Sequence, residues 1–430
     1  MLHANFLAII PYPINHILLR AKKEYNMSKI YAMTPNERRS TFALGGIFAT
    51  RLLGLFMILP TFSVYAHQLP NASATSIGIA LGIYGLTQAL LQLPFGILSD
   101  RFGRKKIITI GLLLFALGSV IAALAHTIDG IIIGRALQGS GAIGSTLIAF
   151  MADLTREEQR SKAMAIMGGM IGLSFSLALI LGPIISFYFS IPAIFALTAA
   201  LALLGIIILY SQVPAPLWHK PQEALTPHLK QIPRLFRNAG LLKLNFGIFA
   251  QHAILTANFV VIPLLLNNLI PNHHLNPLFY LAIIGGAFAI AVPIIVYAHR
   301  KKMAAKLLPW MVGILALSQF FLIFFHNSVW IIALNLIVFF IPFNVLEAEL
   351  PAQISTLAPK TQKGAAMGIY SSCQFFGIFC GGAISGFVYG KIGSTPVFIL
   401  GLGLALIWFT LGLVDSIKRK SGVEDVAGAL

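Results

Sequence analysis

Long apolar stretches dominate the sequence, and their length decides what the chain can fold into. An α-helix of about 20 residues crosses a hydrocarbon core about 30 Å thick. Twelve stretches of this kind lie near residues 40–66, 75–98, 107–126, 128–152, 161–187, 190–212, 243–267, 278–299, 306–325, 328–354, 362–390 and 394–414. Only 10% of the residues are charged and the mean hydropathy is +0.85, which excludes an ordinary soluble domain. The sequence therefore predicts an all-α polytopic membrane protein with twelve transmembrane helices.

The basic residues indicate how the chain is oriented. All but three of the 30 Lys and Arg residues fall on one side of the predicted bundle, the exceptions being Arg51 and Arg135 within spans and Lys391 on the other side. Such asymmetry is the positive-inside pattern, so we expect both termini in the cytoplasm. The net charge of +17 is then an orientation signal, and we expect no nucleic-acid partner. The sequence holds no Cys/His cluster with metal-ligand spacing, so we expect no metal and no cofactor.

The chain also contains an internal repeat. FMILP at residues 56–60 aligns with FVVIP at 259–263 at an offset of 203 residues, and Ala163-Met164 aligns with Ala366-Met367 at the same offset. The matches predict duplication of a six-helix unit. Because both copies begin on the same side, the repeat is parallel, with its axis along the membrane normal. The predicted organisation is a cytoplasmic N-terminal extension (1–39), a first half (40–212), a cytoplasmic linker (213–242), a second half (243–414) and a short cytoplasmic tail (415–430).

Three motifs lie at defined places in this predicted topology. The loop after the second span reads GILSDRFGRKK and contains Gly96, Asp100, Arg101, Gly103 and Arg104. The fourth span reads GRALQG from Gly134, and the fifth contains Gly182-Pro183, followed by Ile184, Ile185 and Ser186. The first motif resembles the signature of the major facilitator superfamily. The second is similar to the R-x-x-Q-G motif of its drug/proton antiporter branch, and the third matches only the core of the antiporter motif, without its trailing glycines.

Within this branch the sequence looks like the YajR-type bacterial inner-membrane transporters. The similarity is carried by the stretches 83–88, 134–143, 153–156 and 241–247. The resemblance implies the superfamily fold, transport by alternating access and location in the bacterial inner membrane. It also implies a charged cluster in which Arg104 pairs with Asp153 at the inner end of the fourth span.

The signature loop predicts a conformational latch. Asp100 ends the second span, where its carboxylate can face the amino end of the eleventh span, and an anion there gains about 0.3–1 kcal/mol. We expect this contact to close the cytoplasmic face and stabilise the outward-open state. Alternatively, the loop charges only determine topology, but that role requires neither an acid nor glycines at these spacings.

Ionisable side chains inside the spans are candidates for proton coupling. Each costs at least ~2.5 kcal/mol at the bilayer centre unless it faces protein or water. Guanidinium groups keep their proton, a carboxyl group in an apolar cavity accepts one more readily than in water, and histidine titrates near neutrality. We therefore expect Glu347 to carry the proton, with His252 second and Arg51 and Arg135 as charge modulators. The alternative is that these groups form interhelical pairs that only hold the bundle together.

Polar and aromatic side chains in the spans are candidates for lining a central cavity. They are Tyr84, Gln88, Gln92, Gln138, Asn245, Asn258, Asn344, Tyr370 and Gln374. Amide and aromatic groups suit a lipophilic or cationic molecule, whereas a phosphorylated one would need several convergent basic groups. We therefore expect a monomeric secondary transporter, not an enzyme, that exports small drug-like molecules in exchange for protons, with membrane lipid as its surroundings. The alternatives are uptake of a sugar or metabolite, an intramembrane enzyme without a known signature, and a receptor that binds without transport.

Overall fold

The computed structural model describes residues 32–214, 235, 238–270, 276–301, 303–359 and 362–420. The described residues are mostly helical. The helices are α2 (Pro35–Phe56), α3 (Leu59–His67), α4 (Ala74–Phe102), α5 (Arg104–Leu124), α6 (Ile128–Ser140), α7 (Gly144–Leu154), α8 (Glu157–Gln212), α10 (Ala239–Leu269), α11 (Asn276–Arg300), α12 (Ala304–Phe324), α13 (Val329–Leu357), α14 (Lys363–Ile392) and α15 (Ser394–Lys420).

Three of the long helical segments are interrupted, and one of these interruptions separates two spans, which is how the helices make twelve crossings. Eleven helical segments of the described chain are long and apolar enough to cross a membrane. One of them, α8, has 56 residues and would be about 84 Å long if straight, far more than a bilayer needs. It bends at Ser190, whose φ is 73°, and so forms two spans. The α2–α3 pair and the α6–α7 pair are each one span with an interruption, so the predicted all-α fold with twelve membrane helices is confirmed.

The helices extend beyond the predicted apolar stretches because polar residues cap them. Thr34 caps α2 in a capping box with Glu37, so this helix begins at Pro35, before residue 40. Asn238 caps α10, which begins before residue 243. The predicted extension, linker and tail fall largely on residues 1–31, 215–234 and 421–430, which lie outside the described residues. The domain boundaries therefore stay predictions.

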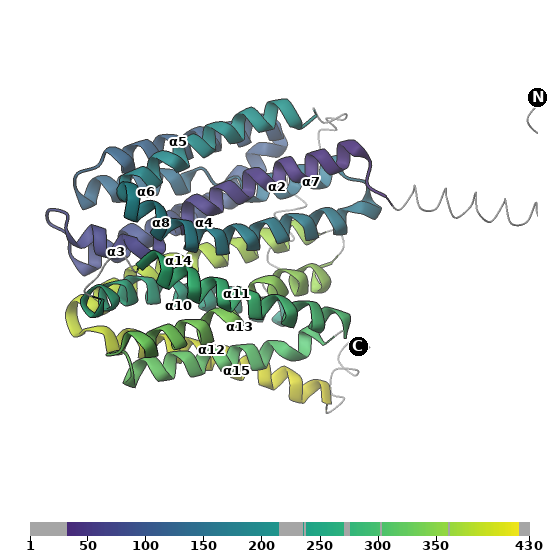
Figure 1. Cartoon of the computed structure of the whole chain (residues 1–430). Coiled ribbons are helices and arrows are strands. Elements are labelled where there is room, and N and C mark those ends of the chain that lie inside the picture. The colour runs from purple at the N-terminus through teal and green to yellow at the C-terminus, as the bar shows by residue number, and fades with distance from the viewer. Residues whose placement is uncertain are drawn as a thin grey trace, which may run out of the picture.

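The helices form two groups that lie side by side (Figure 1). Helices α2 to α8, purple to teal, occupy one half of the bundle, and α10 to α15, green to yellow, occupy the other. Between the halves, α4 packs along α14, α8 packs against α11, and α3 packs against α10. We call the end where α4 turns into α5 the basic end, because Arg101 and Arg104 lie there, and the opposite end the far end.

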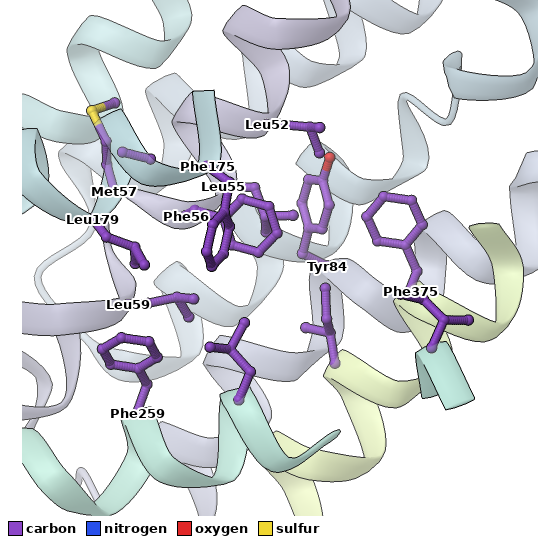
Figure 2. Packing of buried hydrophobic residues seen from close by; sticks show 14 of the residues in the cluster. Leu52, Leu55, Phe56, Met57, Leu59, Tyr84, Phe175, Leu179, Phe259 and Phe375 are labelled. Carbon is purple, nitrogen blue, oxygen red and sulfur yellow. The ribbon is translucent and has the colours of Figure 1, made fainter. Parts of the chain in front are cut away.

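Close backbone packing seals the halves together towards the far end. A methyl carbon added to Gly78 of α4 would lie 2.1 Å from the carbonyl oxygen of Gly382 in α14, and one on Gly82 would lie 2.8 Å from that of Phe379. We call this contact, which also includes Gly85 and Gly386, the glycine seam. Beside it the ring of Tyr84 faces that of Phe375, with centroids 6.1 Å apart (Figure 2). Side chains larger than hydrogen would prevent the two backbones from approaching this closely.

A hydrogen bond between the halves satisfies a carbonyl that a proline leaves free. Pro263 has no N–H, so the carbonyl of Phe259, four residues earlier in α10, lacks its helical donor. The Ser63 hydroxyl of α3 donates to that carbonyl at 2.9 Å. Figure 2 shows the neighbouring contact, where Leu59 of α3 lies close to the ring of Phe259. The far end is thus closed by both the glycine seam and this bond.

Candidate functional site

A directed series of hydrogen bonds begins at Arg51 in the first half. Arg51 is 4% exposed, and its Nη2 donates to Tyr84 Oη at 3.2 Å and to Gln88 Oε1 at 3.0 Å. Gln88 donates to Gln92 Oε1 at 2.9 Å, and Gln92 donates to Ser371 Oγ of α14 at 3.3 Å. These bonds, which we call the arginine chain, connect a buried guanidinium in α2 to the second half through two amides of α4.

The second half contains a partly buried glutamate held by amides. Glu347 of α13 accepts from Gln251 Nε2 of α10 and from Gln374 Nε2 of α14, each at 3.2 Å. His252 Nε2 lies 2.9 Å from Gln374 Nε2 and 3.8 Å from Glu347 Oε2. We call these four residues the glutamate cluster. Its side chains come from the three helices that surround the centre of this half.

The hydrogen-bond partners of His252 fix its protonation state in this conformation. The Nδ1 atom lies 3.3 Å from the carbonyl oxygen of Ile248, which can only accept. The Nε2 atom faces the amide nitrogen of Gln374, which can only donate. We therefore assign a neutral imidazole with its proton on Nδ1. Glu347 is then the group of the cluster whose charge is not set by these contacts.

Arg135 and Gln138 lie apart from the glutamate cluster, inside the first half. The Arg135 side chain is fully buried, donates to the carbonyl oxygens of Ala80 and Leu81 at 3.3 and 3.2 Å, and lies 5.0 Å from the ring centre of Tyr84. It also donates to Gln138 Oε1 at 3.2 Å. These bonds join α6 to α4, so the geometry supports a packing role for the pair. Charge modulation by Arg135 stays a prediction.

The remaining polar residues predicted to line a cavity are buried but differ in their partners. Asn344 donates to Phe340 of its own helix, and Asn245 is 6% exposed. Both amide atoms of Asn258 and the hydroxyl of Tyr370 have no hydrogen-bond partner among the described residues. Such orphaned groups are what a polar ligand or water would satisfy. Contact with a substrate stays a prediction for all of them.

Two residues, one in the arginine chain and one in the glutamate cluster, were not predicted from the sequence. Ser371 receives the arginine chain, and Gln251 holds Glu347 while also donating to the carbonyl oxygen of Phe343 at 3.1 Å. A signal existed for both, since Gln251 precedes His252 and Ser371 lies three residues before Gln374, on the same helix face. An apolar helix otherwise contains many serines and glutamines that only pack.

The signature loop adopts a compact turn at the basic end. Gly103 joins α4 to α5 with a φ of 95°, a conformation that favours glycine. Arg104 pairs with Asp100 and places its Nε 2.9 Å from Asp153 Oδ2, the pairing that the resemblance implied. Among the described residues no hydrogen bond or ion pair joins Asp100 to α14. In this conformation the far end is closed. The latch between the halves thus stays a prediction for another conformation.

The other motif residues have local packing roles in this conformation. A methyl carbon on Gly96 would lie 3.2 Å from Ser145 Oγ of α7, and one on Gly182 would lie 1.9 Å from the Met57 carbonyl oxygen. Pro183 is buried beside Gly182 in α8. The guanidinium of Arg101 lies 5.4 Å from the ring centre of Phe102. These glycines allow α4 and α8 to approach α7 and α2.

An ion pair between a buried glutamate and an exposed arginine near the basic end was not anticipated from the sequence. Glu37, 5% exposed, accepts from Arg156 Nε at 2.9 Å and from Arg156 Nη2 at 3.0 Å. It also accepts from the Arg156 backbone N–H at 2.9 Å, at the N-cap of α8. The hydrogen bond to this carboxylate raises the pKa of the Arg156 guanidinium. The pair fastens the start of α2 to the start of α8.

Known proteins resemble the chain in sequence and in fold. The sequence profile of the Major Facilitator Superfamily matches residues 44–348. The inner membrane transport protein YajR of Escherichia coli is 42% identical over 381 residues, which cover 89% of this chain and 84% of YajR. The quinolone resistance protein NorA of Staphylococcus aureus is 25% identical over 385 residues, covering 85% of this chain and 94% of NorA. The crystal structure of the human organic anion transporter MFSD10 superposes with a TM-score of 0.67 at 18% identity, covering 88% of this chain and all of MFSD10.

These comparisons agree with the geometry. The profile spans most of the twelve-helix bundle, and the Escherichia coli relative is similar along nearly the whole chain, so the predicted resemblance to YajR-type transporters is confirmed. The MFSD10 structure supports the fold alone. The chain is therefore an integral membrane protein that belongs to the major facilitator superfamily of transporters.

Proposed function

We propose that the chain exports drug-like lipophilic or cationic molecules across the bacterial inner membrane in exchange for protons. The observation that carries the proposal is the glutamate cluster, in which a carboxylate inside a membrane span is held by two amides beside a neutral histidine. An ionisable group inside a membrane span is costly, which makes Glu347 a candidate functional residue. The name of NorA, a quinolone resistance protein, supports export of drug-like compounds.

Protonation of Glu347 would rearrange its hydrogen bonds. As a carboxylate, Glu347 only accepts, and it uses both oxygens to hold Gln251 and Gln374. A proton on either oxygen adds a donor to the carboxyl group and makes that oxygen a weaker acceptor, so its bond to Gln251 or Gln374 weakens. Gln374 lies one turn from Ser371 on α14, where the arginine chain ends. The proton on Glu347 is thereby coupled to the contact between the halves.

Arg51 and Glu347 place ionisable groups in opposite halves of the bundle. The guanidinium of Arg51 keeps its proton, so its proposed role is that of a charge modulator, whereas Glu347 is the proposed proton carrier. A proton that crosses a potential of 100 mV supplies about 2.3 kcal/mol, which is enough to shift a poised two-state equilibrium.

Proton release during substrate addition tests the proposal. We would reconstitute the full chain into vesicles with an acidic interior, trap a pH-sensitive dye, and add a panel of lipophilic cations. Wild-type protein should release protons when a substrate is present, and Glu347→Gln should not. Glu349→Gln is the matched control, because Glu349 lies two residues away on α13 but contacts His299 of α11 at 3.1 Å instead of the cluster.

The outcomes separate the candidate functions. Substrate-dependent release that Glu347→Gln abolishes and Glu349→Gln preserves would support antiport with Glu347 as the carrier. No release with any cation from folded protein would reject cation antiport and direct attention to uptake of sugars or metabolites, to be tested by counterflow of labelled compounds. Equal release from wild type and Glu347→Gln would reject the assignment of the carrier.

A further inference from the structure

A cavity near the far end is separate from the central polar residues. It has a volume of about 270 Å³ and lies between α3 and α8 of one half and α10 and α11 of the other. The bend of α8 forms part of its wall, because Ser190 and Ile191 line it where the helix reverses. We call this space the outer cavity.

The lining of the outer cavity is largely apolar and aromatic, with uncharged polar groups. Its described lining includes three aromatic side chains, two amides and several hydroxyls, but no Asp, Glu, Lys, Arg or His. A charged ligand would give up water there without gaining a counter-charge, which is unfavourable. Aromatic rings and amides instead favour a flat uncharged molecule that can also form hydrogen bonds.

Two hydroxyls on opposite sides of the outer cavity lack partners. Tyr280 of α11 is only 3% exposed, and its hydroxyl forms no hydrogen bond among the described residues. The buried Oγ1 of Thr61 in α3 also has none among them. Both residues line the cavity. Since buried polar atoms nearly always have a partner, a ligand or water that reaches these two hydroxyls would satisfy them.

We propose that the outer cavity binds an uncharged aromatic molecule that carries hydroxyl or amide groups, and that Tyr280 and Thr61 form hydrogen bonds with it. The ligand touches both halves and occupies a site distinct from the glutamate cluster. Its binding requires neither proton coupling nor a particular direction of transport. The proposal can therefore fail or succeed independently of the proposed function.

Protection of a cysteine reporter tests the site. In the full-length protein carrying Cys373→Ala and Cys380→Ala, a Ser186→Cys substitution places a thiol in the cavity wall. N-acetyltyrosinamide is the uncharged aromatic probe, and its matched charged forms are N-acetyltyrosine, an anion, and tyrosinamide, a cation. The uncharged probe should slow alkylation of the reporter by a small maleimide, and the charged forms should not. A His126→Cys reporter, exposed at the far end and outside the cavity, should be unaffected.

Substitutions of the two hydroxyl residues distinguish binding from packing. Tyr280→Phe and Thr61→Val should each raise the probe concentration for half-protection by about three- to tenfold, the effect of one lost hydrogen bond. Because each removes a buried hydroxyl without a partner, the melting temperature of the unliganded protein should stay the same or rise. Weaker protection with an unchanged or higher melting temperature is the signature of ligand contact.

Three results would overturn the proposal. The first is no protection by the uncharged probe, and the second is equal protection by its charged forms. The third is half-protection at the same concentration in the wild type, Tyr280→Phe and Thr61→Val backgrounds.

Discussion

The glycine seam yields a prediction about how the far end opens. Gly78→Ala would place a methyl carbon 2.1 Å from the Gly382 carbonyl oxygen and 2.9 Å from the Gly386 Cα. Favourable carbon contacts need about 3.5–4.0 Å, and these neighbours are backbone atoms that cannot rotate away, so α4 and α14 must separate by roughly 1 Å or more. Overpacking of this kind costs about 1–3 kcal/mol. If that cost falls on the closed conformation, the closed-to-open ratio drops roughly 5- to 150-fold.

A cysteine at Asn267 would report this shift. Asn267 lines the outer cavity and is partly buried in the closed conformation. In a background without the native cysteines, labelling of Asn267→Cys by a membrane-impermeant maleimide added at the far end should speed up when Gly78→Ala is introduced. Gly285→Ala is the matched control, because a methyl carbon there has no neighbour within 4 Å. Identical labelling rates with the two glycine variants, in folded protein, would refute the idea that the seam holds the far end closed.

Three other predictions concern contacts between helices. Ser63→Ala leaves the Phe259 carbonyl without its donor and should favour the open far end by about 1 kcal/mol, which the same reporter measures; unchanged labelling would contradict it. Glu37→Gln should lower the melting temperature, because it removes the charge that pairs with Arg156; an unchanged melting temperature would show that the pair contributes little. Arg51→Lys keeps the charge but not the forked donors, so transport should fall at unchanged stability, and normal transport would remove the arginine chain from the mechanism.

The parts of the structure that the sequence predicted are those set by local physics. Bilayer thickness fixes the length of an apolar span, so the twelve crossings could be identified before any contact was known. The predicted boundary between the fifth and sixth spans, at residues 187–190, coincides with the bend of α8 at Ser190. The pairing of Arg104 with Asp153 was foreseen only through the family resemblance.

The contacts between the halves could not be predicted in the same way. Whether Gln92 meets Ser371 depends on how two six-helix units are rotated against each other, and nothing in either helix sets that angle. The sequence analysis also grouped Arg135 with the other ionisable residues inside the spans, because a hydropathy pattern shows only that a charged residue lies in an apolar stretch. Arg135 donates to two backbone carbonyls of α4, and a pattern of side chains in the sequence does not predict such contacts.

The two glutamates of α13 contact different helices, which distinguishes Glu347 from Glu349 as the proposed proton carrier. Residues two apart on a helix point about 200° apart around its axis, so Glu347 faces α10 and α14 while Glu349 faces His299 on α11. Neither α11 nor the contact of Glu349 touches the arginine chain. Gln374, by contrast, lies on the helix that also receives Gln92 from the opposite half. In the proposed mechanism a proton on Glu347 acts on its bonds to α10 and α14, and α14 is the helix that contacts the first half, whereas a proton on Glu349 acts on its contact with α11.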